Sequence, residues 1–183
     1  MKKIYIVTTF TGTLLSCLIR NISKTPYAHV SIALNEYLRP MYSFGRLNPK
    51  TPIFAGFVEE NINEGLYAIR TNTMCRVYSL MVTERQYEKL KENIDNVSIN
   101  RKQYVYDVKA LVYLSVNKPR KKDYKYVCSH FVADMLKILD KEPHQVRPND
   151  FYDLCDLELE YEGLLSNYYE KDKVHNIGDV VKI

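Results

Sequence analysis

The sequence predicts an α+β fold in which a mostly antiparallel sheet packs against helices. Residues 27–34, YAHVSIAL, alternate apolar with small or polar side chains, and 3–10, KIYIVTTF, are rich in β-branched and aromatic residues, so both predict strands. Residues 84–97 and 128–139 instead carry apolar side chains three and four positions apart, the spacing of amphipathic helices. No internal repeat interrupts the pattern, and we expect a single domain over residues 1–183.

The composition is that of an ordinary globular protein. Of 183 residues, 46% are hydrophobic and 26% charged, which excludes the low-hydrophobicity class of disordered chains. The net charge of +4 is spread along the chain, and the most basic stretch, KPRKKDYK at 118–125, predicts a solvated loop rather than a nucleic-acid interface. No stretch approaches the roughly 18 apolar residues of a membrane span. We therefore expect neither a nucleic-acid partner nor a membrane span.

Cysteine usage suggests a reducing compartment. Cys17, Cys75, Cys128 and Cys155 are widely spaced and form no CxxC pair, which argues against a zinc site or a disulfide framework. The first fifteen residues, MKKIYIVTTFTGTLL, contain threonines and a glycine and lack a small-residue cleavage site, so they do not resemble a signal peptide. The expected protein is cytoplasmic with reduced thiols, and no metal or organic cofactor is implied.

Turn residues divide the amino-terminal half. Residues 13–23 have helical apolar spacing, with Thr13 as the expected N-cap. Residues 41–46 predict a strand that returns antiparallel to the one before it. The Pro-, Gly- and Asn-containing stretch 47–64 predicts a loop with at most a short strand at 55–60, and its length makes it a candidate lid.

The carboxy-terminal half continues the mixture of strands and helices. The expected elements are, in order, strand pairing over 65–83, helices over 84–97, 106–116 and 128–139, a short helix within 147–157, an edge strand over 157–165 and a possible strand over 174–183. Thr83 is the expected cap of the first helix, and Asn149 or Asp150 the expected cap of the short one. For 106–116, a strand is the alternative to the helix.

Cys128 stands where an extended, tyrosine-rich run becomes an apolar helix, in YKYVCSHFVADMLKILD at 124–140. It shares a stripe with Phe131, Val132 and Met135, which favours a small core residue. However, the first turn of a helix offers free N–H groups and the positive end of the dipole, which favour a thiolate and a developing oxyanion. Cys128 is therefore either a packing residue or a nucleophile.

A thiol nucleophile needs an imidazole that takes and returns its proton. His29 is the best candidate, because the other side chains on its face of the predicted strand, Ser31 and Ala33, are small and leave room for a helix. The remaining histidines are weaker candidates. His130 points about 200° away from Cys128 around the helix, and His144 and His175 fall in predicted loop or tail.

The two motifs together resemble a known family. TPYAHVSIAL at 25–34, followed about a hundred residues later by YKYVCSHFVADML at 124–136, resembles the circularly permuted branch of the NlpC-type papain-fold cysteine hydrolases, close to the YiiX/YebB-like proteins and more distantly to lecithin:retinol acyltransferase. The histidine strand precedes the cysteine helix, which is the permuted order. The resemblance extends over 4–20, 28–46 and 147–154. It implies a permuted papain-like fold, with Cys128 as nucleophile and His29 as general base and acid.

The third catalytic residue departs from the family pattern. Relatives place a His, Glu or similar polar residue on the strand after the histidine strand, where this chain has Tyr42 and Ser43. Ser43 is the expected third residue, since its hydroxyl can accept a hydrogen bond from the imidazole, although it stabilises an imidazolium less than a carboxylate does. Further candidates for this role are Tyr42, Glu36, Glu59 and Glu60.

The resemblance implies a thiol hydrolase, either an amidase or peptidase or an acyl hydrolase or transferase, that works through an acyl-enzyme. Its expected partner is a peptide, amide or acyl-ester substrate, and the oligomeric state is left open. The alternative is that the protein is a non-catalytic binding module with the same papain-like fold. A metal site through Cys128 and His130 is disfavoured, because residues two apart on a helix diverge.

Overall fold

The structure is a computed structural model. It describes residues 1–13, 16–17, 20–21, 25–48, 51–115, 118–137, 141–152, 154 and 156–168. Of these, residues 51–53, 112, 114 and 115 are described by their backbone alone. No helix within these ranges has the length and apolar character to cross a membrane.

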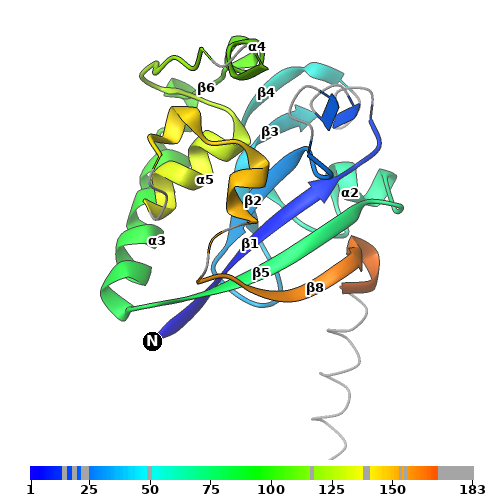
Figure 1. Cartoon of the computed structure of the whole chain (residues 1–183), viewed down its shortest axis with the longest axis vertical. Helices are drawn as coiled ribbons and strands as arrows, with labels where there is room; N and C mark the ends of the chain where they lie inside the picture. Colours follow the sequence, from blue (N-terminus) through cyan, green and yellow to red (C-terminus); the bar gives the residue numbers. More distant parts are fainter. Residues whose placement is uncertain are drawn as a thin grey trace, which may run out of the picture.

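The described chain builds one six-stranded sheet in the order β4-β3-β2-β1-β5-β8, in which every neighbouring pair is antiparallel (Figure 1). Its strands are β1 (Lys2–Phe10), β2 (His29–Ala33), β3 (Met41–Asn48), β4 (Thr51–Glu60), β5 (Met74–Val82) and β8 (Glu158–Leu164). The expected α+β class with an antiparallel sheet is therefore confirmed, and so is the edge position of β8.

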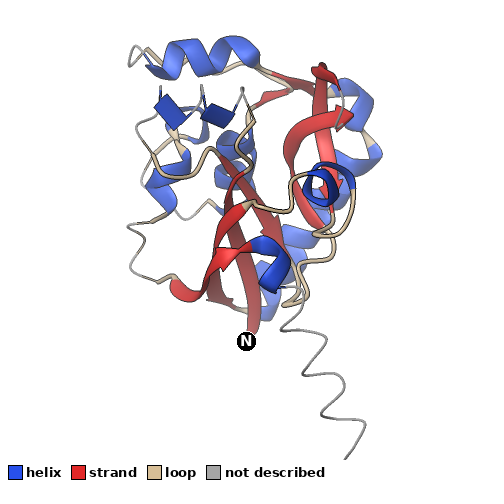
Figure 2. Cartoon of the chain, turned by 90° about the vertical axis from the view of Figure 1, so that its right-hand side faces the viewer, coloured by secondary structure: helices blue, strands red, loops and turns tan. Residues whose placement is uncertain are grey.

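The helices lie on both faces of this sheet (Figures 1 and 2). They are α2 (Gly65–Ile69), α3 (Glu84–Ile99), α4 (Val108–Ser115) and α5 (Cys128–Leu136). The helix α3 begins as expected, because the Thr83 hydroxyl accepts a hydrogen bond from the Gln86 N–H and the Gln86 side chain accepts one from the Thr83 N–H. The helix expected over 106–116 is confirmed by α4.

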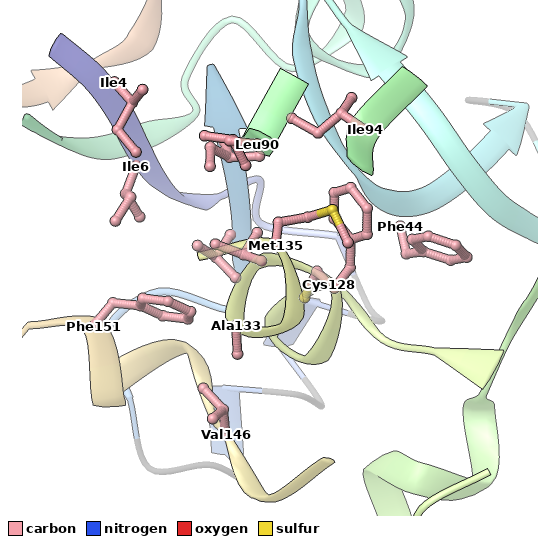
Figure 3. Close-up of a cluster of buried hydrophobic side chains, with 14 of the residues drawn as sticks. Ile4, Ile6, Phe44, Leu90, Ile94, Cys128, Ala133, Met135, Val146 and Phe151 are labelled. Carbon is pink, nitrogen blue, oxygen red and sulfur yellow. The ribbon is translucent and has the colours of Figure 1, made fainter. Parts of the chain in front are cut away.

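Strand alternation divides the core into two clusters. Even-numbered residues of the central strands pack with α3 and α5 on one face, and they include Ile4, Ile6, Val30, Ile32 and Phe44 (Figure 3). Odd-numbered residues pack on the opposite face, where α2 lies, and they include Tyr5, Val7, Ala33, Cys75 and Val77. Both faces of the sheet are therefore buried.

The loop predicted over 47–64 is wrong for 51–54, while the short strand expected at 55–60 is present as part of a longer one. Residues 51–60 form β4, which pairs with β3 from Asn48↔Thr51 to Met41↔Glu60, so this stretch is not a lid. Its proline is compatible with a strand because β4 is at the edge of the sheet, where a missing N–H costs no ladder bond. The strand pairing expected from residue 65 onward also begins later, since 65–69 form the helix α2 and β5 starts at Met74.

Smaller differences concern the turns. Thr13 caps a helical turn as expected, accepting a hydrogen bond from the Ser16 N–H at 3.3 Å, although most of 13–23 lies outside the described residues. The short helix within 147–157 is a 3-10 turn, Pro148–Phe151. The Asp150 carboxylate accepts from the Arg147 N–H at 2.7 Å, so this aspartate acts from the third position and not as the cap. The stretch 174–183 lies outside the described residues.

Candidate active site

The helix α5 begins at Cys128 because the extended chain before it is held in place. The two-residue strands β6 (Val105–Tyr106) and β7 (Lys125–Tyr126) run parallel, with Asp107 N–H donating to the Tyr126 carbonyl at 2.9 Å. Helical bonding then starts with the Phe131 N–H and the Val127 carbonyl, 3.1 Å apart. No side chain caps this helix, since the N-cap residue is Val127. Its first-turn N–H groups therefore receive no side-chain acceptor at the cap.

Cys128 is a member of the core cluster between the sheet and the helices α3 and α5, where Figure 3 shows it near Ala133, Met135 and Phe44. Its side chain is buried, with 4% of the residue exposed. The predicted apolar stripe is present, because Phe131 and Val132 of the same helix are fully buried against the sheet. Cys128 belongs to the core by burial, and only its neighbours at the helix tip distinguish it from an ordinary core cysteine.

His29 is the first residue of β2 and pairs with Thr9 of β1. Its side chain is one-fifth exposed, which places the imidazole at the end of the sheet rather than within it. The His29 and Cys128 side chains lie close enough to interact electrostatically. The structure thus brings together the two residues that the sequence predicts as nucleophile and base.

The route by which they meet differs from the one the sequence predicts. The small face of β2 does not receive the cysteine helix, because α5 packs on the opposite face, against Val30 and Ile32. Ser31 instead faces Glu60, and Ala33 joins the core on the α2 side. Only the position of His29 at the very start of β2 lets its ring reach the tip of α5.

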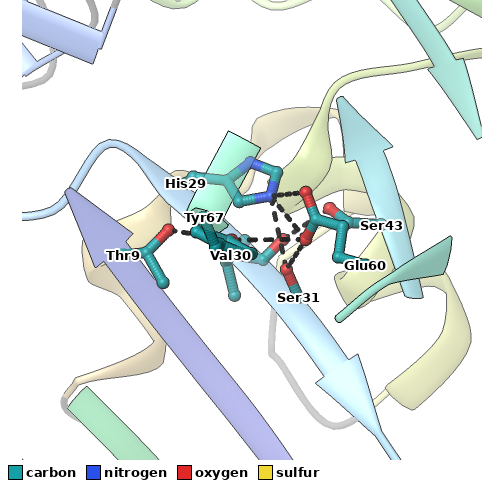
Figure 4. A network of polar contacts seen from close by, with 7 residues as sticks. All are labelled: Thr9, His29, Val30, Ser31, Ser43, Glu60 and Tyr67. Carbon is teal, nitrogen blue, oxygen red and sulfur yellow. Dashed lines mark hydrogen bonds and ion pairs between the residues drawn. The ribbon is translucent and has the colours of Figure 1, made fainter. Parts of the chain in front are cut away.

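A carboxylate holds the other side of the imidazole. Both oxygens of Glu60, the last residue of β4, lie 3.1 Å from His29 Nε2 (Figure 4). Ser31 donates its hydroxyl to Glu60 Oε2 at 2.7 Å, and Tyr67 of α2 donates to the same oxygen at 3.4 Å. Tyr67 in turn contacts the Thr9 hydroxyl at 3.3 Å. Glu60 is therefore held by side chains from β2 and α2.

These contacts determine the tautomer of His29. A carboxylate only accepts hydrogen bonds, so Nε2 carries the proton when it bonds to Glu60, and Nδ1 is left as the nitrogen that can receive the thiol proton. Burial works to lower the pKa of His29. The charge of Glu60, together with the interaction with Cys128 and the hydrogen bond to Glu60, outweighs burial and raises that pKa well above its ordinary value. The site therefore favours an imidazolium.

The same balance operates on the acidic partners. Burial would raise the pKa of Glu60, but the charge of His29 and hydrogen bonds from His29, Ser31 and Tyr67 lower it below the ordinary value. Burial, reinforced by the Glu60 charge, raises the pKa of the Tyr67 hydroxyl well above its ordinary value. Tyr67 accordingly remains a protonated donor, and Glu60 remains a carboxylate.

Ser43 does not occupy the predicted third position. Its fully buried hydroxyl donates to the Val30 carbonyl at 2.7 Å, a contact between neighbouring strands (Figure 4). The carboxylate beside His29 belongs to Glu60, which the sequence leaves as a further candidate for the third position. The carboxylate that contacts the imidazole therefore comes from β4, two strands away from His29 in the sheet.

Tyr42, Glu59 and Glu36 also lie apart from the imidazole. Tyr42 stacks on Phe57, with ring centroids 6.3 Å apart. Glu59 accepts a hydrogen bond from Ser98 of α3 at 3.3 Å, and Glu36 lies in the turn after β2. Adjacent strand residues point to opposite faces, which is why Glu59 faces α3 while Glu60 faces His29.

The remaining histidines do not join the site. His130 is buried on α5, its Nε2 has no hydrogen-bond partner among the described residues, and burial followed by the charge of His144 lowers its pKa to about 4. His144 lies in the 3-10 turn Pro143–Gln145. His175 lies outside the described residues. Within the described ranges, no three His, Cys, Asp or Glu side chains are grouped so that they could hold a metal ion.

A cavity of about 200 Å³ opens beside His29. Its wall is formed by residues of the β1–β2 connection, β3, β4, α2 and α4: Thr11, Thr13, Ser16, Ala28, His29, Phe44, Gly45, Arg46, Ala55, Glu60, Leu66, Tyr67, Tyr106, Val108 and Leu111. Gly45 lies next to the ring and the carboxylate, since a Cβ there would lie at ordinary contact distance, 3.5 Å from His29 Cε1 and 3.4 Å from Glu60 Oε1. The cavity offers room for a small, mostly apolar group next to the base.

Sequence reasoning missed the residues that support Glu60. Ser31 was considered only for its small size, and Tyr67 and Thr9 were not singled out. The alternation of HVSIA did contain a signal for Ser31, because it shares a face with His29. Tyr67 carried no such signal, because its place depends on a five-residue helix that no periodicity identifies.

Comparison with known proteins does not assign this chain to a family. The chain matches no protein-family model and no curated protein sequence. The function therefore has to be inferred from the fold and from the geometry around Cys128, His29 and Glu60.

Proposed function

We propose that this protein is a thiol hydrolase or acyltransferase in which Cys128 is the nucleophile, His29 the general base and acid, and Glu60 the residue that orients His29. One observation carries the proposal: the imidazole of His29 is hydrogen-bonded to the Glu60 carboxylate and interacts electrostatically with the Cys128 thiol. Nucleophilic catalysis needs a nucleophile, a base in contact with it and a third group that orients the base.

The proposed reaction follows from these contacts. Cys128 gives its proton to His29, and the thiolate attacks the carbonyl of an amide, ester or thioester. First-turn N–H groups of α5, which no side chain caps at Val127, stabilise the negative charge that develops on the carbonyl oxygen. The imidazolium, stabilised by Glu60, then protonates the leaving group. Water or another acceptor resolves the thioester and returns Cys128 to its thiol form.

The proposed architecture is a permuted papain-like, NlpC-type fold. The strand with His29 precedes the helix with Cys128 in the chain, and the cysteine stands at the tip of a helix packed on an antiparallel sheet. This order and context are those that the resemblance implies. We also propose a cytoplasmic location, where thiols such as Cys17, Cys75 and Cys128, all free in the structure, stay reduced.

A non-catalytic binding module of the same fold is the second candidate. The observation in its favour is the burial of Cys128, of which 4% is exposed. In that case Cys128 is a packing residue of the core, and its contact with the His29 imidazole has no catalytic role. The two candidates differ in whether Cys128 can be acylated.

The proposal is tested by acylation with para-nitrophenyl acetate. We expect release of para-nitrophenolate and, in acid-quenched samples, an acetyl group on the Cys128 peptide by mass spectrometry. The variants Cys128→Ala and His29→Ala should lose this acylation. Cys17→Ala is the matched control, because it removes a half-buried thiol of the same chain and should retain it.

The outcome separates the two candidates. Acetylation at Cys128 that depends on His29 supports the hydrolase. Acetylation that is absent at Cys128, in protein whose circular dichroism shows an intact fold, supports the binding module.

A further inference from the structure

The cavity beside His29 contains a cation among small and apolar side chains. Arg46 of β3 follows Gly45 directly and lines this cavity together with His29. Its Nη2 donates to the Thr13 hydroxyl at 3.1 Å. Among the residues that the structure describes, no carboxylate lies within ion-pair distance of the guanidinium.

The described surroundings of Arg46 do not compensate its charge. Burial, together with the neighbouring positive charge of Arg70, lowers the pKa of the Arg46 guanidinium. Glu60 lines the same cavity, but its oxygens bond to His29, Ser31 and Tyr67. A half-buried cation without a counter-ion in this part of the chain is costly, and an anionic ligand removes that cost.

Arg46 is also close to the reacting atoms. Tyr106 of β6 lines the same cavity, and its hydroxyl interacts electrostatically with both Cys128 and Arg46. Burial raises the pKa of Tyr106, so this hydroxyl is a protonated donor. A guanidinium and a phenol, both capable of donating hydrogen bonds, therefore line the cavity beside His29, and the phenol also interacts electrostatically with the thiol.

A carboxylate is the anion that fits this arrangement. The planar guanidinium matches a carboxylate with two parallel hydrogen bonds. A cavity of about 200 Å³ is smaller than the roughly 300–1,000 Å³ of sites for drug-sized ligands, so it suits a short chain. The apolar wall, with Leu66, Val108 and Leu111, suits methylene groups between the carbonyl and the carboxylate.

We infer that the substrate of this site carries a short acyl group that ends in a carboxylate, and that Arg46 binds this carboxylate while Cys128 attacks the carbonyl at the other end. The inference rests on the proposed hydrolase function and specifies its substrate class. Arg46 is then the residue that determines specificity among acyl groups.

The test compares two esters of the same length. Mono-para-nitrophenyl glutarate carries a free carboxylate, and its methyl ester carries none. In both, the Cys128 sulfur forms a thioester as the bond to para-nitrophenolate breaks, and the thiol proton passes through His29 to the leaving oxygen. Each ester is measured with wild type, Arg46→Gln, Arg46→Lys and Arg85→Gln, the last being a matched control on the exposed face of α3.

We expect wild type to prefer the free carboxylate in kcat/KM by about tenfold or more, as for a hydrogen bond between charged groups. Arg46→Gln should bring the kcat/KM ratio of the two esters close to one. Arg46→Lys should retain part of the preference for the free carboxylate, and Arg85→Gln should retain all of it. A ratio that Arg46→Gln does not change would overturn the inference.

Acylation of Cys128 by para-nitrophenyl acetate separates the remaining outcomes. If Cys128 reacts with the acetate but with neither glutarate ester, the inference is overturned and the hydrolase proposal stands. If Cys128 reacts with none of the three esters, the substrate inference and the hydrolase proposal are both wrong.

Discussion

Both carboxylate oxygens of Glu60 lie 3.1 Å from His29 Nε2, although His29 begins its strand and Glu60 ends another. This contact fixes the ring so that Nδ1 is available to Cys128, and it makes the imidazolium the favoured form. We therefore expect the reactivity of Cys128 to depend on Glu60 as well as on His29.

The first prediction concerns Glu60→Gln. The amide keeps the size of the side chain and can accept from Nε2, but it removes the charge that stabilises the imidazolium. We expect acylation of Cys128 to slow by about 10- to 100-fold, up to the lower end of the range of about 100- to 10,000-fold attributed to general acid–base catalysis, because the base itself is retained. Glu59→Gln is the matched control, because its side chain faces Ser98 and not His29. Equal losses in the two variants would contradict the role of Glu60.

The second prediction concerns Ser43→Ala. Its buried hydroxyl donates to the Val30 carbonyl, so the substitution removes one donor from that acceptor. We expect a loss of about 1 kcal/mol in unfolding free energy, measured by urea denaturation. The acylation rate of Cys128 should stay within about twofold of wild type, since a rate factor above that needs a contact with the reacting groups. A large rate loss at unchanged stability would return Ser43 to the catalytic site.

The third prediction concerns pH and stability. A folded-state pKa of His29 above its ordinary 6.5 stabilises the fold fully below pH 6.5, and this contribution disappears as the pH rises through the raised value. A folded-state pKa of Glu60 below its ordinary 4.5 contributes above pH 4.5 and is lost as the pH falls through the lowered value. The ion pair therefore stabilises most between these limits.

His29→Gln tests this directly. Urea denaturation should show a destabilisation of about 1–3 kcal/mol near pH 5.5 that shrinks towards pH 9. If the difference from wild type is the same at both pH values, His29 and Glu60 do not form a charge pair in the folded state.

The fourth prediction concerns Gly45. A Cβ at this position would make ordinary contacts with His29 and Glu60, so Gly45→Ala should fold and remain reactive. Gly45→Val adds two methyl groups at the cavity wall and should slow acylation by about tenfold or more, because the base or the carbonyl is displaced. The comparison of the two variants by para-nitrophenolate release is the measurement. Similar rates in both would show that the cavity is not the route to Cys128.

The elements with strong periodicity could be identified from the sequence. The alternation around His29 and the apolar stripe behind Cys128 were sufficient to place a strand and a helix, and both are present. Only the second half of β4 was expected as a strand, because proline and glycine suggested a loop, whereas the edge of a sheet tolerates both. The short helix α2 was missed because five residues are too few for a helical period.

The candidate site was only partly predictable for a similar reason. Cys128 and His29 were identified from local context, and the electrostatic interaction between their side chains agrees with that pairing. The choice among Ser43, Glu59 and Glu60 depended on which strand would pair with β3 and how its end would turn, and no local pattern contains that information.

The most direct test of the central claim is the rate of iodoacetamide alkylation at each cysteine, measured by mass spectrometry on wild type and His29→Ala. Exposure alone favours Cys17, which is half-buried, over Cys128, which is buried, while burial raises the pKa of Cys75 to about 12 and makes it slow. If Cys128 is a nucleophile paired with His29, it reacts faster than Cys17 in wild type and loses that advantage in His29→Ala. If Cys128 reacts more slowly than Cys17 in both proteins, it is a core residue and the hydrolase proposal is wrong.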